Sequence, residues 1–348
     1  LAWWSDLPGA TQPATGSILA HGDQCLQQLA EASLDTDWGL RDVSNEEGIY
    51  DGMSYHQGSV WPLFTGWAAL AEFRGGQPLA GYRMLMQNAD LTWAQDLGAD
   101  TELLSGDFYA PFGRSTSHQL WSSAMVITPT LRGLFGISID AQTKTITVNP
   151  HLPADWSGAD VRNLPLSGGP GQIHINQDSD GLRISMGGYP PSEWHLRSDL
   201  PGAQIHADKQ SRSTVIVIPA PPLEVNLLFR QLDQNGSGLT PEQYAPPIPG
   251  ARTQRYRVVR EEYSDHKLVL SVEGKAGTTA RLVLKRRAGI LPKLIVGAAE
   301  ATNSDRNEVT LTSDGGPYLS PDNSFPLLLT FHFPPAEDWK TITVTLTW

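Results

Sequence analysis

The chain has 348 residues, and at about 150 residues per domain it corresponds to two or three domains. Hydrophobic residues make up 40% and charged residues 18%, which excludes a disordered or fibrous protein. A net charge of −12 argues against a non-specific nucleic-acid binder, and the apolar runs are short for a membrane span of about 20 residues. The single cysteine, Cys25, excludes an intramolecular disulfide framework and a zinc site built on several thiolates, but leaves the compartment open.

Acidic groups and tryptophans are concentrated in the first 140 residues. This part carries 5 arginines, no lysine and 16 carboxylates, a balance of 5 − 16 = −11, and it holds seven of the 11 tryptophans. Indole faces stack on sugar C–H groups and carboxylates accept hydrogen bonds from hydroxyls, so this composition suits a neutral polyhydroxylated ligand. The alternative is that the tryptophans fill a core and the acids keep the surface soluble, and composition alone favours that alternative.

Four helices are expected before residue 140. The first is capped by Asp23, and the second begins near Ser59, has Pro62 in its first turn and ends at the following glycine pair. The third follows that pair, and the fourth runs from about 117 to 135 with a kink at Pro129. The apolar positions expected to face inward are, in chain order, Cys25, Leu26, Leu29 and Ala30; Leu63, Phe64, Trp67, Leu70 and Ala71; Tyr82, Leu85, Met86, Ala89 and Trp93; and Leu120, Ala124, Ile127, Leu131 and Leu134.

Two long connections, 34–58 and 97–116, lie between these helices, and their aromatic content indicates ordered site loops. After Asp140 the apolar pattern changes to a period of two, which indicates strands. The strands are expected at 143–148, 172–176, 182–186, 213–218, 223–228, 255–260, 267–272, 280–285, 308–312, 326–331 and 341–347. The expected division is a helical part over 1–139, a β-sandwich over 140–230, a linker over 231–251 and a second β-sandwich-like part over 252–348.

Four short motifs follow one another between residues 35 and 156. They are D-W-G-L-R at 37–41, Y-H-Q-G-S-V-W-P at 55–62, E-L-L-S-G at 102–106 with Q-L-W-S-S-A at 119–124, and P-H-L-P-A-D-W at 150–156. In this order they resemble the motifs of the (α/α)6-barrel, or six-hairpin, glycoside hydrolases. The similarity is to the family 63-like group, with its glucosidase I, mannosylglycerate hydrolase and amylo-α-1,6-glucosidase or glycogen-debranching types.

The resemblance implies a multidomain α+β fold in which the last helices of an (α/α)6 barrel precede one or two antiparallel β-sandwich domains. It also implies inverting hydrolysis of α-glucosidic linkages in an oligosaccharide or polysaccharide substrate. Glu102 matches the family's water-activating glutamate, which in an inverting pair stands about 6.5–9.5 Å from the second carboxyl group. The side chains that would line the sugar subsites are Trp38, Arg41, Tyr55, His56, Trp61 and Trp121.

Alternatives stay open for several of these residues. Trp61 and Trp121 each begin a helix and are equally suited to a core, and His56 is placed either to bind a hydroxyl or to cap the next helix. Asp37 is placed to hold Arg41 or to bind the sugar. The fallback catalytic carboxylates are Glu46, Glu47 and Asp107.

The family's general acid has no matching position in this sequence, and 1–139 holds only four or five of twelve barrel helices. We therefore expect the C-terminal part of a glycosidase, active in its full-length form but not as this chain alone. The open edge is expected to show an apolar patch along Leu26 and Leu29, or along Leu63, Phe64 and Trp67. The alternative is a non-catalytic carbohydrate-binding or scaffold protein. Neither a metal-ligand spacing nor a phosphate loop is visible, so no metal or cofactor is expected, and a calcium ion bound by loop carboxylates is the alternative that stays open.

Overall fold

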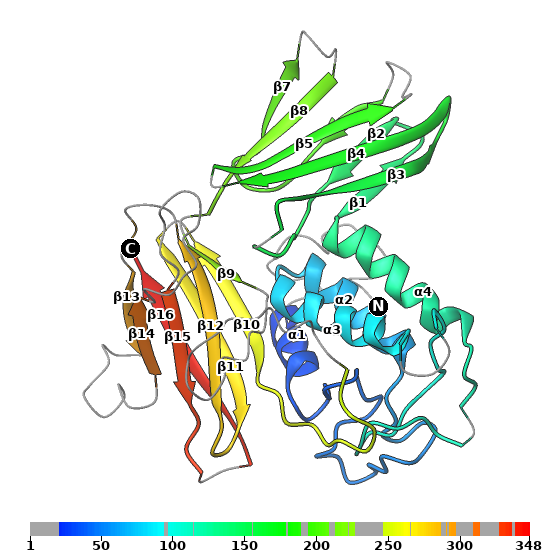
Figure 1. The fold of residues 1–348 in the computed structure, drawn as a ribbon, viewed down its shortest axis with the longest axis vertical. Helices are drawn as coiled ribbons and strands as arrows, with labels where there is room; N and C mark the ends of the chain where they lie inside the picture. The colour runs from blue at the N-terminus through cyan, green and yellow to red at the C-terminus, as the bar shows by residue number, and fades with distance from the viewer. Residues whose placement is uncertain are drawn as a thin grey trace.

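The computed structural model describes residues 21–93, 97–113, 115–154, 156–178, 180–188, 194–208, 213–221, 223–226, 246–264, 266–286, 290, 292–296, 309–313, 327–335 and 338–348. Within these ranges the fold is mixed, with helices followed by several mainly antiparallel sheets (Figure 1). The helical elements are α1 (Gly22–Ala30), α2 (Pro62–Arg74), α3 (Pro78–Leu91), α4 (Leu120–Pro129) and the π-helical η1 (Thr130–Leu134).

The described strands form four sheets. One has the order β1 (Ile137–Asp140), β2 (Thr145–Val148), β6 (His195–Arg197), and another has the order β3 (Gly158–Leu166), β4 (Gly169–Asp178), β5 (Gly181–Gly188), β8 (Ser213–Pro219), β7 (Gln204–Asp208). The third has the order β10 (Arg257–Ser264), β11 (Lys267–Lys275), β16 (Trp339–Thr347), β13 (Lys293–Val296). The fourth has the order β14 (Val309–Ser313), β15 (Leu327–His332), β12 (Thr279–Arg286), β9 (Leu223–Asn226). The β2–β6 pairing is parallel and the other pairings are antiparallel.

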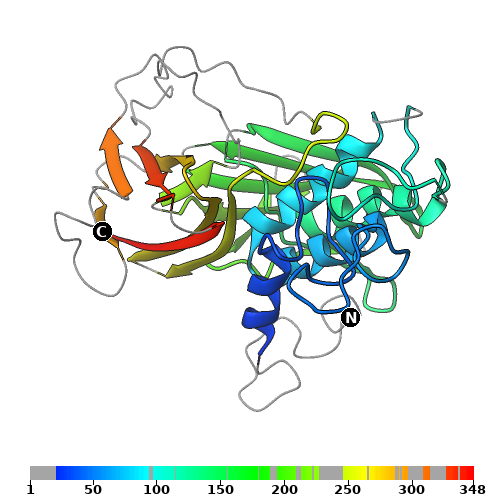
Figure 2. The same cartoon turned by 90° about the horizontal axis from the view of Figure 1, so that it is seen from below.

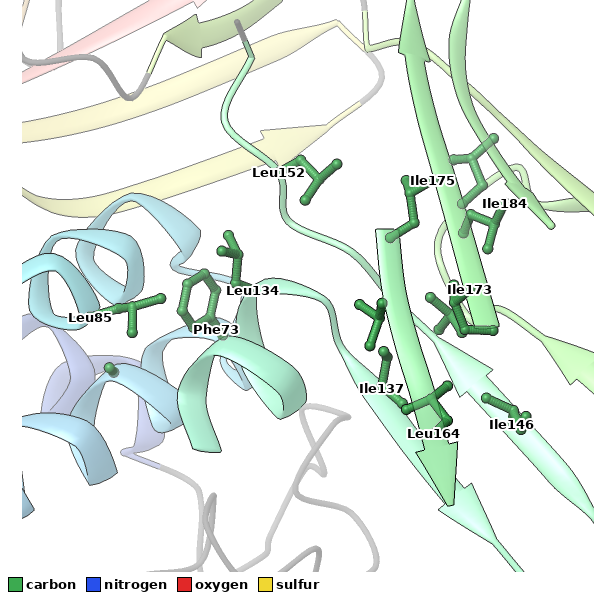
Figure 3. Close-up of a cluster of buried hydrophobic side chains, with 14 of the residues drawn as sticks. Phe73, Leu85, Leu134, Ile137, Ile146, Leu152, Leu164, Ile173, Ile175 and Ile184 are labelled. Atoms are coloured by element: carbon green, nitrogen blue, oxygen red, sulfur yellow. The ribbon is translucent and has the colours of Figure 1, made fainter. Parts of the chain in front are cut away.

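The helices share one hydrophobic core with the first two sheets. Phe73 and Leu85 from the helices lie with Ile137, Ile173 and other aliphatic strand residues in a single buried cluster (Figure 3). Seen from below, the five-stranded sheet lies behind the helices (Figure 2). A second core fills the space between the two four-stranded sheets, where residues at alternate strand positions point inward. The helical part and the first sheets therefore stabilise one another.

Local signals explain where α2 begins and ends. Pro62 stands at its first position, where the missing N–H has no helical acceptor, and Trp61 is the N-cap residue. Gly75 is the C-cap, and Gly76 follows with φ of +76°, in the left-handed region that glycine tolerates. The expected second helix is present, starting at Pro62. In α1 the N-cap is His21, so the capping role expected for Asp23 is wrong.

The face that α4 buries differs from the predicted face. Leu120 is 84% exposed and Ile127 is 60% exposed, although both were expected to point inward. The buried side contains Met125, which contacts α2 at Gly66, where a Cβ would overlap the Met125 side chain. The absence of a side chain at Gly66 allows this close approach and sets the rotation of α4. The α-helix ends at the predicted kink residue, Pro129, and η1 continues from it.

Other predictions about apolar positions also need correction: Cys25, expected on the inward face of α1, is exposed. Trp93 lies beyond the end of α3 and is exposed, so it is not part of an inward stripe. For the expected apolar patch on α1 or α2, Leu26 is buried and Leu29, Leu63, Phe64 and Trp67 are half-buried, so none of the named side chains is fully exposed. The exposed apolar side chains of the helices lie on α4 instead.

Strands are present at every range in which they were expected after Asp140. The pattern missed five more: β1, β3, β6, β7 and β13. In β3 the alternation is interrupted because the register shifts between Val161 and Leu164, and Asn163 has φ of +61°. β9 pairs with β12, so it belongs with the later sheets and not with the sheets of 140–230. Residues 231–245 of the expected linker lie outside the described residues.

Candidate functional site

Backbone pairing joins the two predicted site loops at the ends of the helices that face away from the five-stranded sheet (Figure 1). Arg41 pairs with Val60, and Val60 pairs in turn with Leu104. The Val60 and Leu104 backbones exchange two N–H···O hydrogen bonds, both of 2.9 Å. Val60 and Leu104, which are 44 positions apart in the sequence, are thereby held side by side, as expected of ordered site loops.

The Tyr55 hydroxyl donates a hydrogen bond to Oε1 of Glu102, so these two candidates lie together. This bond is the main cause that raises the pKa of the Tyr55 phenol, because it favours the protonated form. Glu102 is only 7% exposed, and its backbone N–H donates to the Thr116 carbonyl over 2.9 Å. The Glu102 carboxylate is therefore largely buried, and the more exposed Tyr55 ring lies beside it.

Tyr55, His56 and Trp61 form an aromatic cluster next to Glu102. The His56 ring is stacked on the Trp61 indole, with 1° between the planes and 5.3 Å between centroids. Tyr55 meets both rings edge-on, at 4.6 Å from His56 and 4.9 Å from Trp61. The Trp61 Nε1–H donates to the Ser59 hydroxyl over 2.9 Å, and the indole is buried. The exposed His56 ring thus lies on the buried Trp61 ring.

Trp38 and Arg41 are buried and donate hydrogen bonds to backbone carbonyls, which differs from the subsite role expected of them. Trp38 is 1% exposed, and its Nε1–H donates to the Ser105 carbonyl over 2.9 Å. The buried guanidinium of Arg41 donates from Nε to the Gly106 carbonyl over 2.8 Å and from a terminal nitrogen to the Ala32 carbonyl over 2.7 Å. Their polar atoms bind loop backbone, and the Trp38 ring has no face open to a sugar in this conformation.

The remaining predicted residues are more dispersed. Trp121, the second residue of α4, is 42% exposed, and its convergence with Glu102 stays a prediction. Asp37 accepts hydrogen bonds from the backbone N–H groups of Gln254 and Arg255, so it holds a later segment and not Arg41. Asp107 accepts a hydrogen bond from Tyr50. The other two fallback carboxylates, Glu46 and Glu47, are exposed on the first loop.

Several buried or half-buried acids near the loops were missed by sequence reasoning, among them Asp42, Asp90 and Asp100. Asp42 accepts a hydrogen bond from the Gly58 N–H over 2.7 Å, and burial raises the pKa of this carboxyl while that hydrogen bond opposes the effect. Burial also raises the pKa of Asp90 to about 7 and that of Asp100 to about 6. Burial depends on tertiary packing, so the spacing of these residues gave no signal. The nearest sequence signal for any of them is that Asp42 directly follows Arg41, the last residue of the first motif.

The described residues contain no group of three or more His, Cys, Asp or Glu side chains that could hold a metal ion. None of the helices in the described ranges is long and apolar enough to cross a membrane. No protein-family model matches the chain, and no curated protein matches it.

Proposed function

We propose that the chain belongs to a glycoside hydrolase that cleaves α-glucosidic linkages with inversion, and that Glu102 is the general base. The contact between Tyr55 and Glu102, beside the His56–Trp61 stack, is the observation that supports this proposal best. It combines a largely buried carboxylate with aromatic rings, the combination that a sugar-cleaving site needs. In this proposal α2, α3 and α4 are the last helices of an (α/α)6 barrel, and the two loops lie at its mouth.

The proposed chemistry is a direct displacement at the anomeric carbon. Glu102 accepts a proton from a water molecule, the water oxygen forms a bond to the anomeric carbon, and the bond to the glycosidic oxygen breaks. The leaving oxygen takes its proton from a second carboxyl group about 6.5–9.5 Å from the first. Tyr55 orients Glu102 by its hydrogen bond, and His56 is placed to bind a sugar hydroxyl.

One observation favours a second candidate, a sugar-binding protein without hydrolase activity. Among the described residues, Glu102 is the only carboxylate with a hydrogen bond to a ring of the Tyr55–His56–Trp61 cluster. Inverting hydrolysis needs two carboxyl groups, whereas binding needs only hydrogen-bonding groups and aromatic faces.

Product analysis distinguishes the two candidates. Maltotriose and isomaltotriose are incubated with the full-length form of the protein, and the anomers of the released glucose are followed by 1H NMR. Hydrolysis that yields the β-anomer first supports the inverting mechanism, and α-anomer first contradicts it. Saturable binding without release of glucose supports the second candidate. Neither binding nor release with either sugar contradicts both.

A further inference from the structure

Tyr50 lies between the two site loops, in a slot that glycines leave open. Its hydroxyl donates to Oδ1 of Asp107 over 2.9 Å, which connects the first loop to the second. A Cβ at Gly58 would lie 2.6 Å from the Tyr50 ring, and a Cβ at Gly52 or Gly106 would lie 2.7 Å from its hydroxyl oxygen. Real Cβ atoms do not approach other atoms this closely, so the ring fits only because these three positions lack side chains.

Arg41 holds the same ring from another direction. The guanidinium carbon lies 5.9 Å from the centroid of the Tyr50 ring, within the range of a cation–π contact. The Nε of the same guanidinium donates to the Gly106 carbonyl, and the Gly106 N–H donates to the Gly52 carbonyl over 2.8 Å. Tyr50 is thus placed where both loops and their buried arginine meet.

We propose that Tyr50 is a positioning residue that sets the contact between Tyr55 and Glu102. Tyr55 follows Tyr50 by five positions, and Glu102 precedes Asp107 by five. The segment between 51 and 57 is closed by a hydrogen bond of 2.7 Å from the Asp51 N–H to the Gln57 carbonyl. This closed turn carries Tyr55, so a shift of its anchor at Tyr50 moves the phenol relative to the carboxylate. The inference rests on the proposed function only in that Glu102 is taken as the general base and Tyr55 as the residue that orients it.

The test uses tyrosine labelled with 13C at Cζ, whose resonance reports the ionisation of each phenol. A Tyr55→Phe variant assigns the Tyr55 signal. In the wild-type chain the Tyr55 pKa lies above its ordinary value because of the bond to Glu102. The variant Tyr50→Phe keeps the ring and removes the hydroxyl, so we expect the Tyr55 pKa to fall toward about 10.

Tyr256→Phe is the matched control. The Tyr256 hydroxyl donates to the Arg281 carbonyl over 2.8 Å in the later β part, so this variant also removes one phenol hydrogen bond. Loss of stability alone affects both variants, but only Tyr50→Phe is expected to change the Tyr55 titration. If both variants leave that titration unchanged, Tyr50 has only a structural role and the inference is wrong. An equal shift in both variants contradicts it as well.

A second variant tests the same hydrogen bond from its acceptor. Asp107→Ala removes the acceptor, so its effect on the Tyr55 titration is expected to equal that of Tyr50→Phe. The double variant is expected to add nothing further, because both changes break one bond. Additive shifts contradict a shared hydrogen bond. Failure of the wild-type chain to bind either maltotriose or isomaltotriose contradicts the proposed function, and the titration still decides the role of Tyr50.

Discussion

Glu102 is the residue on which the proposed chemistry depends most. Replacing it by glutamine keeps the size and one acceptor oxygen of the side chain but removes its ability to accept a proton. In the full-length form, Glu102→Gln is therefore expected to lower kcat by about 10²–10⁴-fold and to leave sugar binding largely intact. Steady-state kinetics and calorimetric binding separate the two effects. The exposed Asp23→Asn is the control, and near-wild-type turnover of Glu102→Gln removes Glu102 from the mechanism.

The glycines of the loops are a second feature at the residue scale. A Cβ at Gly106 would overlap the carbonyl oxygen of Gly58, whereas a Cβ at Gly48 meets nothing within 4 Å. Gly106→Ala is therefore expected to lower the free energy of unfolding by about 1–3 kcal/mol, the usual cost of overpacking. Gly48→Ala is expected to leave it nearly unchanged. Urea unfolding measures both, and equal stabilities contradict the close approach of the two loops.

At the element scale, α4 shows what periodicity predicts and what it does not. The prediction of a helix over this segment was correct because apolar residues recur at helical spacing. The predicted buried face was wrong because apolar residues occur on every side of α4. The contact of Met125 with Gly66 decides how α4 is rotated about its axis. The strands after Asp140 were easier to predict, since their period of two fixes the inward face. The partner of β9 depends on contacts far apart in the sequence, which no local pattern specifies.

The two faces of α4 allow a direct comparison within one helix. Met125 is buried against α2 and Ile127 is mostly exposed. Met125→Ala is expected to lower the free energy of unfolding by about 2–5 kcal/mol, the range for large-to-small changes in a core. Ile127→Ala is expected to change it by about 0.5 kcal/mol or less. Thermal and urea unfolding measure the difference, and the reverse order contradicts the observed rotation of the helix.

For the molecule as a whole, the buried carboxyl groups predict how stability depends on pH. Burial raises the pKa of Asp90 to about 7, so the folded chain binds this proton more tightly than the unfolded chain. The contribution of Asp90 is fully present below the unfolded pKa of about 4 and is lost as the pH rises through about 7. The free energy of unfolding is therefore expected to fall over this range, and Asp90→Asn is expected to flatten the fall. The exposed Asp23→Asn is the control, and equal slopes in all three proteins contradict the shifted pKa.

The loops that form the candidate site were also predictable in part. Their length and aromatic content indicated a site, and the motifs brought Tyr55, His56, Trp61 and Glu102 together as candidates. The roles of Trp38 and Arg41 were not predictable, because a motif residue that binds a ligand and one that supports the loop backbone look alike in sequence. Tyr50 was missed because its slot is built by glycines from two loops.

The most direct measurement follows the 13Cζ resonance of Tyr55 while maltotriose or isomaltotriose is added. A sugar bound at Glu102 changes the hydrogen bond that the Tyr55 hydroxyl makes. We expect a saturable shift of the Tyr55 signal with at least one of the two sugars, no shift of the Tyr256 signal, and loss of the response in Glu102→Ala. Unchanged Tyr55 signals with both sugars, or equal shifts of Tyr55 and Tyr256, would contradict a sugar site at Tyr55 and Glu102.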